Sequence, residues 1–363
     1  MKEIYASDEN LSIVVQGLPC KETLSYLKKL RQLFDRAELI LSTWVGVDAK
    51  IFEGVVDKVI LNDDPGAAPF YFSKEKSVLN NVNRQIVSTV SGLKASSRPL
   101  VMKVRTDFVL SNRSILEYWG KYPRRTEKYS LFENRIIISS IFSCLYAPKT
   151  FIPQPFFVSD FFAFGLREDL LLLYGSAPLA NEEELGAWRF KFPQLVPVVG
   201  LRCRYAPEQM IFLHAAKKKF TEIFFDDWTD ICERTIVLSN HLLMNNFIFL
   251  DPAQIGLESN KHRNNLDRAN RGEIEGLLYN KTFEMRYCDL FYDKWEVYEK
   301  LPDSIQLREI EFEDDGGEGR VRLKLQKHRN RLKVCTKSFV QAFGVFWEPF
   351  VIAYYWARTK FKI

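Results

Sequence analysis

The chain lacks the short motifs that mark several common enzyme classes. No GxGxxG follows its first apolar run, and neither GxxxxGKS nor GxxxxGKT occurs anywhere, so dinucleotide oxidoreductases and P-loop nucleotidases are disfavoured. Its four histidines show no HExxH or other metal-ligand spacing, which removes support for a zinc hydrolase. What remains is a set of acidic, amide and basic groups at the ends of predicted strands.

Paired cysteines and long apolar runs are also missing. The six cysteines form no CxxC pair, and the chain opens with the polar run MKEIYASDENLS, so we expect reduced thiols in a cytoplasmic protein. No apolar run reaches the roughly 18 residues that cross a bilayer, because Glu348 and Pro349 interrupt the longest candidate. The sequence therefore predicts a protein that lies on a membrane without crossing it.

The net charge is small but unevenly placed. A value of +5 gives no indication of a nucleic-acid partner. Residues 320–363 nevertheless contain eleven Lys or Arg and a single acid, Glu348, so a basic end follows a slightly acidic body. Aromatic residues make up 14% of the chain, more than a core usually requires, and we expect some of them to bind ligands.

Short apolar runs alternate with amphipathic segments over the first 110 residues. This pattern is typical of a βαβ nucleotide-binding half-domain with a mostly parallel sheet, and it predicts the α/β class. Predicted strands cover 12–16, 38–44, 58–61, 100–104, 135–144 and 151–158. Predicted helices begin at a Thr23 cap, extend over about 78–93, and open at Pro207.

We divide the chain into a main domain over 1–250, with halves at 1–110 and 111–250, and an extension over 251–363. A hairpin is predicted around the turn at 314–317. Between 339 and 356 the aromatic residues are spaced three and four apart, with basic flanks. This spacing fits either the core stripe of a helix, which Pro349 must kink or break, or an anchor at a membrane surface.

Asp107 follows the fourth predicted strand, at the edge where open α/β sheets bind ligands. Its carboxylate could coordinate Mg or Mn bridging a diphosphate, since oxygen ligands suit these ions, or it could only cap the next turn. Lys103 and Arg105 alternate with Val104 and should share one face. There, Arg105 could contact phosphate, or both charges could be solvated.

Two other charged groups are candidates for contacts with a nucleotide. Arg84 lies with Asn81 on one face of a predicted helix and could reach a donor sugar or diphosphate, or simply face solvent. Asp63 and Asp64 precede Pro65; a turn accounts for them, but their place at a strand end also allows a nucleotide contact.

Two carboxylates in the middle of the chain are candidates for catalysis. Glu208 lies at the start of a predicted helix, where the helix dipole stabilises an anion. Asp160 precedes an aromatic run that could stack on a sugar ring. Sugar transfer from a nucleotide donor needs cations for the leaving diphosphate and one carboxylate to deprotonate the acceptor hydroxyl. Either carboxylate could be this base, and a helix cap would also account for Glu208; we favour Glu208 as the base and Asp160 for substrate binding.

Seven ordered segments carry a family resemblance: 12–17 (SIVVQG), 41–44 (LSTW), 62–66 (NDDPG), 81–85 (NVNRQ), 103–107 (KVRTD), 159–165 (SDFFAFG) and 207–209 (PEQ). They resemble the WavE-type lipopolysaccharide-synthesis family up to about residue 210. That family is associated with surface glycans of Gram-negative bacteria. The resemblance implies a GT-A-like, Rossmann-type glycosyltransferase domain at the inner-membrane surface, with a nucleotide-sugar donor and a lipid-linked or oligosaccharide acceptor in lipopolysaccharide or capsule synthesis.

The resemblance also implies where the donor binds. The implied donor contacts are Gln16, Gly17, Thr43, Asp63, Asp64, Arg84, Lys103, Arg105 and Asp107. Asp107 stands at the last carboxylate of the metal-binding DxD motif, and His262 is the implied further ligand of Mn or Mg. The triplet here is Arg105-Thr106-Asp107, so the first carboxylate is absent, and the Arg105 cation could replace part of the role of the ion.

Functions of different classes remain open. A glycosyltransferase is the first, and a non-catalytic member of a polysaccharide assembly complex, with a nucleotide-like domain that has lost its metal site, is the second. Stabilisation by a nucleoside diphosphate would favour the transferase. A phosphotransferase acting on a glycan is a third possibility and would bind a nucleotide without sugar-dependent turnover.

Overall fold

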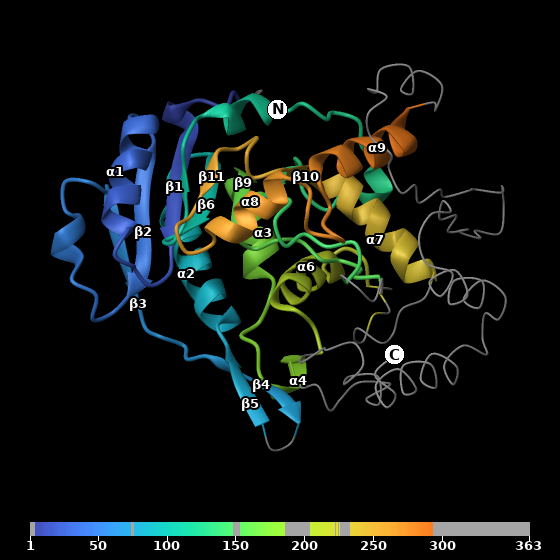
Figure 1. Cartoon of the computed structure of the whole chain (residues 1–363), viewed down its shortest axis with the longest axis horizontal. Coiled ribbons are helices and arrows are strands. Elements are labelled where there is room, and N and C mark those ends of the chain that lie inside the picture. Colours follow the sequence, from blue (N-terminus) through green and yellow to red (C-terminus); the bar gives the residue numbers. More distant parts are fainter. Residues whose placement is uncertain are drawn as a thin grey trace.

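The protein is built on a seven-stranded central sheet, as a computed structural model shows (Figure 1). The structure describes residues 4–73, 76–147, 153–185, 204–221, 223, 225 and 233–292. The strand order is β10-β8-β9-β6-β1-β2-β3. The strands are β1 (Leu11–Gln16), β2 (Glu38–Trp44), β3 (Lys58–Asn62), β6 (Leu100–Arg105), β8 (Ile136–Ser139), β9 (Phe162–Leu166) and β10 (Phe247–Leu250).

All neighbouring strands in this sheet are parallel except where β9 pairs antiparallel with β6 and β8. The predicted α/β class with a mostly parallel sheet is therefore confirmed. The strands predicted at 12–16, 38–44 and 100–104 are confirmed to within one residue, and the strand predicted at 58–61 extends to Asn62. Every residue of β1 and β2 is buried, which explains why they read as mostly apolar runs.

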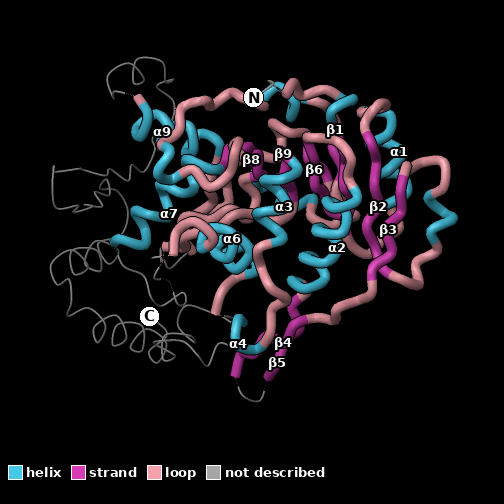
Figure 2. Tube along the Cα trace, turned by 180° about the vertical axis from the view of Figure 1, so that it is seen from behind, coloured by secondary structure: helices cyan, strands magenta, loops and turns pink. Residues whose placement is uncertain are grey.

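Helices pack against the strands of the sheet. They are α1 (Thr23–Leu33), α2 (Val82–Ala95), α3 (Arg167–Gly175), α4 (Glu182–Leu185), α6 (Pro207–Lys217), α7 (Glu233–Asn246), α8 (Arg263–Asn270) and α9 (Asn280–Phe291). Seen from behind, α2 and α3 lie side by side against the strands (Figure 2). Gly92 allows α2 to come this close, because a Cβ there would lie 2.3 Å from Cγ1 of Val14 in β1.

The helix predicted over 78–93 begins four residues later than predicted. Residues 76–80 instead form β5 (Lys76–Asn80), which pairs antiparallel with β4 (Ala68–Ser73). The side chain of Asn80 accepts a hydrogen bond from the Val82 amide at 2.8 Å, so α2 starts only after it. The Thr23 cap is also wrong by one residue: Glu22 is the N-cap, and the Thr23 hydroxyl donates to the Thr106 carbonyl at 3.1 Å.

The two strands predicted in the middle of the chain are largely wrong. The strand predicted at 135–144 is shortened to β8, and the described part of the one predicted at 151–158 is not a strand. Phe142 and Phe156 have φ angles of 60° and 59°, a left-handed conformation that interrupts extended backbone. The strand that enters the sheet is β9, formed by the aromatic run after Asp160.

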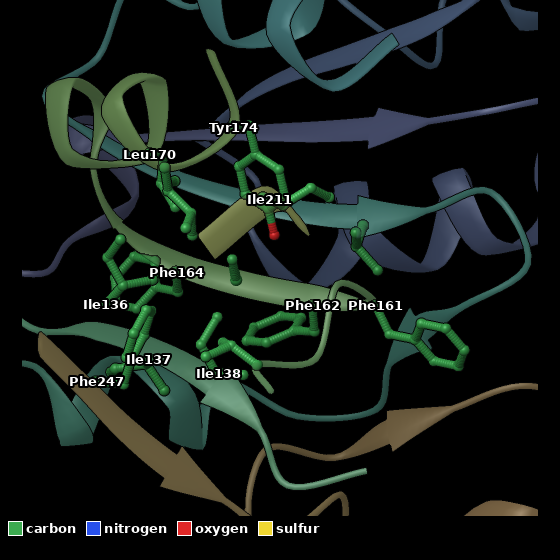
Figure 3. Close-up of a cluster of buried hydrophobic side chains, with 14 of the residues drawn as sticks. Ile136, Ile137, Ile138, Phe161, Phe162, Phe164, Leu170, Tyr174, Ile211 and Phe247 are labelled. Carbon is green, nitrogen blue, oxygen red and sulfur yellow. The ribbon is translucent and has the colours of Figure 1, made fainter. Parts of the chain in front are cut away.

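The hydrophobic core lies between the strands and the helices that cover them. Aromatic and aliphatic side chains from β8, β9 and β10 meet those of α3 and α6, and Figure 3 shows Phe162, Phe164 and Phe247 within this cluster. Phe161, the residue before β9, lies at the edge of this cluster (Figure 3). Outside the sheet, β7 (Val109–Leu110) pairs antiparallel with β11 (Leu257–Glu258), which brings the segment before α8 next to the segment after β6.

The hairpin predicted around 314–317 and the aromatic segment at 339–356 lie outside the described residues. Within the described part of the chain, no helix is both long enough and apolar enough to pass through a bilayer.

Candidate functional site

The sheet has a topological switch point between β1 and β6. From β1 the chain proceeds through β2 to β3 on one side, whereas β6 pairs with β1 on the other, with Gln16 opposite Arg105. Open α/β sheets bind ligands at such a point, beyond the carboxyl ends of the strands. The loops after β1 and β6 are joined here, because the Thr106 hydroxyl donates to the Leu18 carbonyl at 2.8 Å. Gly17, with φ of 116°, forms the turn beside it.

Asp107 is the centre of a cluster of basic groups at this edge. Arg105 binds it with two parallel hydrogen bonds, from Nε to Oδ1 at 2.9 Å and from Nη2 to Oδ2 at 2.8 Å. The Lys261 ammonium lies 3.1 Å from Oδ2, and Nε2 of His262 lies 3.4 Å from the same oxygen. Lys261 and His262 reach Asp107 because β11 is paired to β7 just after β6.

The charges in this cluster oppose the effect of burial on Asp107. Burial alone would raise the pKa of Asp107, but the hydrogen bonds and charges of Arg105 and Lys261 outweigh it, and the pKa falls below its usual value. For His262, burial lowers the pKa, attraction to Asp107 opposes this, and Arg105 and Lys261 add to the lowering. Near neutral pH the cluster therefore contains an ionised Asp107 and a largely neutral His262.

Aromatic rings hold the basic groups in place. The Arg105 guanidinium lies over the Phe161 ring, 4.5 Å from its centroid. The His262 ring stacks on Phe108 with centroids 5.0 Å apart and an interplanar angle of 13°. Phe161 belongs to the segment that leads into β9, and because β9 runs antiparallel, its start lies beside the end of β6. Phe161 is therefore in position to pack against Phe108 and the Arg105 guanidinium.

A buried group of ionisable side chains lies next to this cluster. Lys103 is fully buried in β6, and its ammonium donates to the main-chain carbonyl of Asp160. Oδ1 of Asp160 and the Tyr174 hydroxyl are buried with no hydrogen-bond partner in the described part of the chain. Burial lowers the pKa of Lys103 to about 8, against the attraction of the Asp160 charge. Two unpaired polar atoms beside a buried ammonium are unusual in a structure whose only task is stability.

Glu208 completes this group from the first turn of α6. Burial and the negative charge of Asp160 raise its pKa to about 8, so the carboxyl group holds a proton near neutral pH. The structure brings together the two carboxyl groups that the sequence assigned to catalysis, from positions 48 residues apart in the chain.

Three of the predicted donor contacts lie elsewhere, on an exposed rim near the start of α2. Arg84 binds Asp64 with two hydrogen bonds, at 2.8 and 2.7 Å, and also donates to Asn81 at 2.9 Å. Asp63 is exposed beside them.

The remaining predicted donor contacts differ in how well a ligand could reach them. Gln16 is buried at the end of β1, where its side-chain oxygen accepts a hydrogen bond from Ser88 at 2.6 Å. Thr43 is fully buried in β2, and its hydroxyl has no hydrogen-bond partner in the described part of the chain. Lys103 is also fully buried, and its ammonium binds the Asp160 carbonyl rather than facing solvent.

The implied metal ligands Asp107 and His262 do meet, but their surroundings fit a divalent ion poorly. Within the described residues, no group of three or more His, Cys, Asp or Glu side chains is arranged to hold a metal. Arg105 engages both carboxylate oxygens of Asp107, and Lys261 approaches one of them. Oxygen-rich sites with several carboxylates are what Mg and Mn prefer. The donor set here is one carboxylate, already neutralised, and one imidazole.

Sequence reasoning missed Lys261 and Tyr174. Tyr174 reads as an ordinary apolar position of α3, although its ring lies 5.2 Å from the Lys103 ammonium. Lys261 is 154 residues from Asp107 in the chain, and no local pattern relates the two. Its position next to His262 in the sequence is the one signal that could have identified it.

A family model described as WavE lipopolysaccharide synthesis matches residues 12–299, which include every site residue described above. No curated protein matches the chain.

Proposed function

Because this chain belongs to the WavE lipopolysaccharide synthesis family, we propose that it is a glycosyltransferase that extends a bacterial surface glycan from a nucleotide-sugar donor. The family match confirms the resemblance found in the sequence motifs and assigns the chain to lipopolysaccharide synthesis. The finer proposal of sugar transfer on a GT-A-like fold is supported by the chemistry of the site at the switch point of the sheet.

The observation that carries this proposal is the Asp160–Glu208 carboxyl pair, with Asp160 buried and Glu208 partly buried, beside Lys103 and Arg105. Glycosyl transfer requires a group that accepts the proton of the acceptor hydroxyl and positive charge near the leaving diphosphate. The carboxyl pair can provide the first, and Arg105 with its neighbours can provide the second. With a pKa near 8, Glu208 is mostly protonated at neutral pH, and the ionised fraction that can accept the acceptor's proton grows as pH rises toward 8.

In this proposal Glu208 is the general base, and Asp160 binds a hydroxyl through its unpaired Oδ1. The nucleotide lies over Gln16 and Gly17, with Asp63, Asp64 and Arg84 at the rim of its site. The acceptor is a lipid-linked or oligosaccharide glycan that approaches from the membrane surface. The Phe161 ring is buried and packs against Arg105 and Phe108, so it supports the basic groups of the site rather than stacking on a sugar.

The proposal is tested in two steps. Thermal unfolding with a panel of nucleotide-sugars identifies the donor, because a ligand at a hundred times its dissociation constant adds about 2.7 kcal/mol of stability. Release of nucleoside diphosphate is then measured with that donor and with lipopolysaccharide from a strain that lacks the gene. Glu208→Gln should lower turnover by about 10²- to 10⁴-fold with little change in donor binding. Glu273→Gln, at an exposed carboxylate paired with Arg271, is the control.

Two results would redirect the assignment. Wild-type turnover in Glu208→Gln would show that another group is the base. If the folded wild-type protein binds no donor and releases no nucleoside diphosphate, the non-catalytic role in a polysaccharide assembly complex is the better explanation.

A further inference from the structure

The charges around Asp107 are unbalanced in favour of the cations. Arg105 and Lys261 each lie within ion-pair distance of this one carboxylate. Arg105 alone satisfies both of its oxygens, so Lys261 is a second positive charge on an anion that is already paired. The Asp107 side chain is only 10% exposed, whereas the Lys261 side chain is 65% exposed. The excess positive charge therefore lies on the side of the cluster that faces solvent.

This charge balance is the opposite of what a divalent ion requires. Like charges this close repel one another at a protein surface, so a metal ion bound at Asp107 would be repelled by both Arg105 and Lys261. An anion would be attracted by both. Arg105 uses Nε and Nη2 on Asp107, and its other guanidinium N–H groups can donate to a phosphate oxygen.

We propose that Arg105 and Lys261 bind the diphosphate of the donor directly, with Asp107 as their internal counter-ion, so that the site neutralises the leaving group without a divalent ion. This inference rests on the proposed function and identifies how its donor is held. Arg105 is the fixed member of the site, because Phe161 and Asp107 hold its guanidinium. Lys261 is the adaptable member, exposed and attached to the segment just before α8.

The start of α8 strengthens this site. The helix begins at Arg263, directly after Lys261 and His262, so its unpaired backbone N–H groups are oriented toward the region of Lys261 and add positive potential. Phosphate binding requires Lys261 to exchange one Asp107 oxygen for a phosphate oxygen, whereas Arg105 can keep Asp107 neutralised. The exchange involves one exposed side chain and no change in the sheet.

The first test uses inorganic pyrophosphate and a panel of nucleoside diphosphates, titrated by calorimetry in excess EDTA. The wild-type protein should bind them without added metal. Lys261→Ala should weaken binding by about tenfold, the effect of losing one charge-assisted contact, and Lys261→Arg should restore most of it. Arg36→Ala is the matched control, since Arg36 is an exposed cation in an ion pair with Glu9, just before β2 at the opposite end of the strands from the site.

Asp107→Asn has opposite expected effects on diphosphate binding for a metal site and for a metal-free site. If Asp107 were a metal ligand, this substitution would abolish metal-dependent binding of the diphosphate. If Asp107 is the counter-ion that competes with phosphate, binding in EDTA should be unchanged or tighter. Thermal unfolding without ligand shows whether the variant folds, and the exposed Lys261 variants decide the question if it does not.

The possible results separate this inference from the proposed function. Nucleotide binding that appears only with Mn or Mg, and disappears in Asp107→Asn, would overturn the metal-free site while leaving the transferase intact. Absence of nucleotide and pyrophosphate binding in every condition would overturn both. Equal pyrophosphate affinity in wild type, Lys261→Ala and Arg36→Ala would also overturn the site, because the attraction would then be nonspecific.

Discussion

Two arginines in this protein hold an aspartate in nearly the same way, but in different surroundings. Arg84 binds Asp64 at 2.8 and 2.7 Å, and Arg105 binds Asp107 at 2.9 and 2.8 Å, each through Nε and Nη2. On the rim, the side chains of Arg84 and Asp64 are 37% and 46% exposed; at the switch point, those of Arg105 and Asp107 are 25% and 10% exposed.

Because of their different burial, the two ion pairs differ in how much each charge depends on its partner. An exposed pair exchanges easily with water and contributes little to stability. In a buried pair, each charge depends on its partner, and removal of one leaves the other without compensation. The buried pair also has neighbours that the rim pair lacks, namely Lys261, His262 and the Lys103–Asp160–Glu208 group. From this difference we infer that the charged groups at the switch point, rather than the rim pair, take part in the reaction.

Arg105→Ala should have the largest effect on stability. It leaves the Asp107 carboxylate with Lys261 and His262 as its remaining partners and removes the contact with Phe161. We expect a loss of about 2–3 kcal/mol in the free energy of unfolding, less than for a fully buried pair because Lys261 remains. Urea-induced unfolding at pH 7 measures this loss.

The double variant Arg105→Ala/Asp107→Ala sharpens this expectation. If the cost arises from an uncompensated charge, removal of both partners should recover much of the stability lost in Arg105→Ala. A double variant as unstable as the sum of the two single variants would show that packing on Phe161, rather than charge, stabilises this edge.

A second, smaller effect should appear in the dependence of stability on pH. The pKa of Glu208 is raised to about 8 in the folded protein but is near 4.3 in an unfolded chain, so the folded state binds the extra proton between these values. The stabilisation is complete below the unfolded pKa and is lost as pH rises through the folded pKa. The limiting slope is roughly 1.4 kcal/mol per pH unit, or up to about 2 kcal/mol between pH 6.5 and 8.

Glu208→Gln should remove this part of the slope. The window from pH 6.5 to 8 lies above the pKa of Asp169, which burial raises to about 6, so Asp169 adds little to it. Unfolding free energies at closely spaced pH values provide the measurement. A slope that is the same in Glu208→Gln and wild type would mean that Glu208 ionises normally and cannot hold a proton at neutral pH.

Much of the fold could be predicted because the first half of the sheet has simple requirements. Strands buried on both faces need mostly apolar runs, and β1, β2 and β6 are mostly apolar. Strand β9 could not be predicted in the same way, since a single antiparallel strand inside a parallel sheet has no local signature. Phe142 and Phe156 adopt a left-handed conformation that interrupts the strands favoured by composition. These interruptions could not be predicted, because nothing in a phenylalanine residue indicates a positive φ.

The sequence identified several residues of the candidate site but not the contacts between them. Asp107, Asp160 and Glu208 stood out by their positions beside strands and helices, and His262 was suggested by the family resemblance. The structure brings all four to one edge. What sequence could not provide was the partner of each charge: Lys261 at Asp107, and Lys103 at the Asp160 backbone. These contacts depend on the pairing of β7 with β11 and of β6 with β9, which join segments far apart in the chain.

Substitutions in the rim pair of Arg84 and Asp64 should have the smallest effects, and they complete the comparison with the pair at the switch point. Arg84→Ala should leave the thermal unfolding midpoint at the wild-type value, because Asp64 is exposed enough to be solvated once Arg84 is removed. If Arg84 also contacts the donor, affinity should fall by no more than about fivefold, the limit for one exposed charge. Asp64→Ala should not weaken donor binding, since it frees Arg84. A loss of affinity in Arg84→Ala as large as that in Lys261→Ala would place the diphosphate at the rim instead.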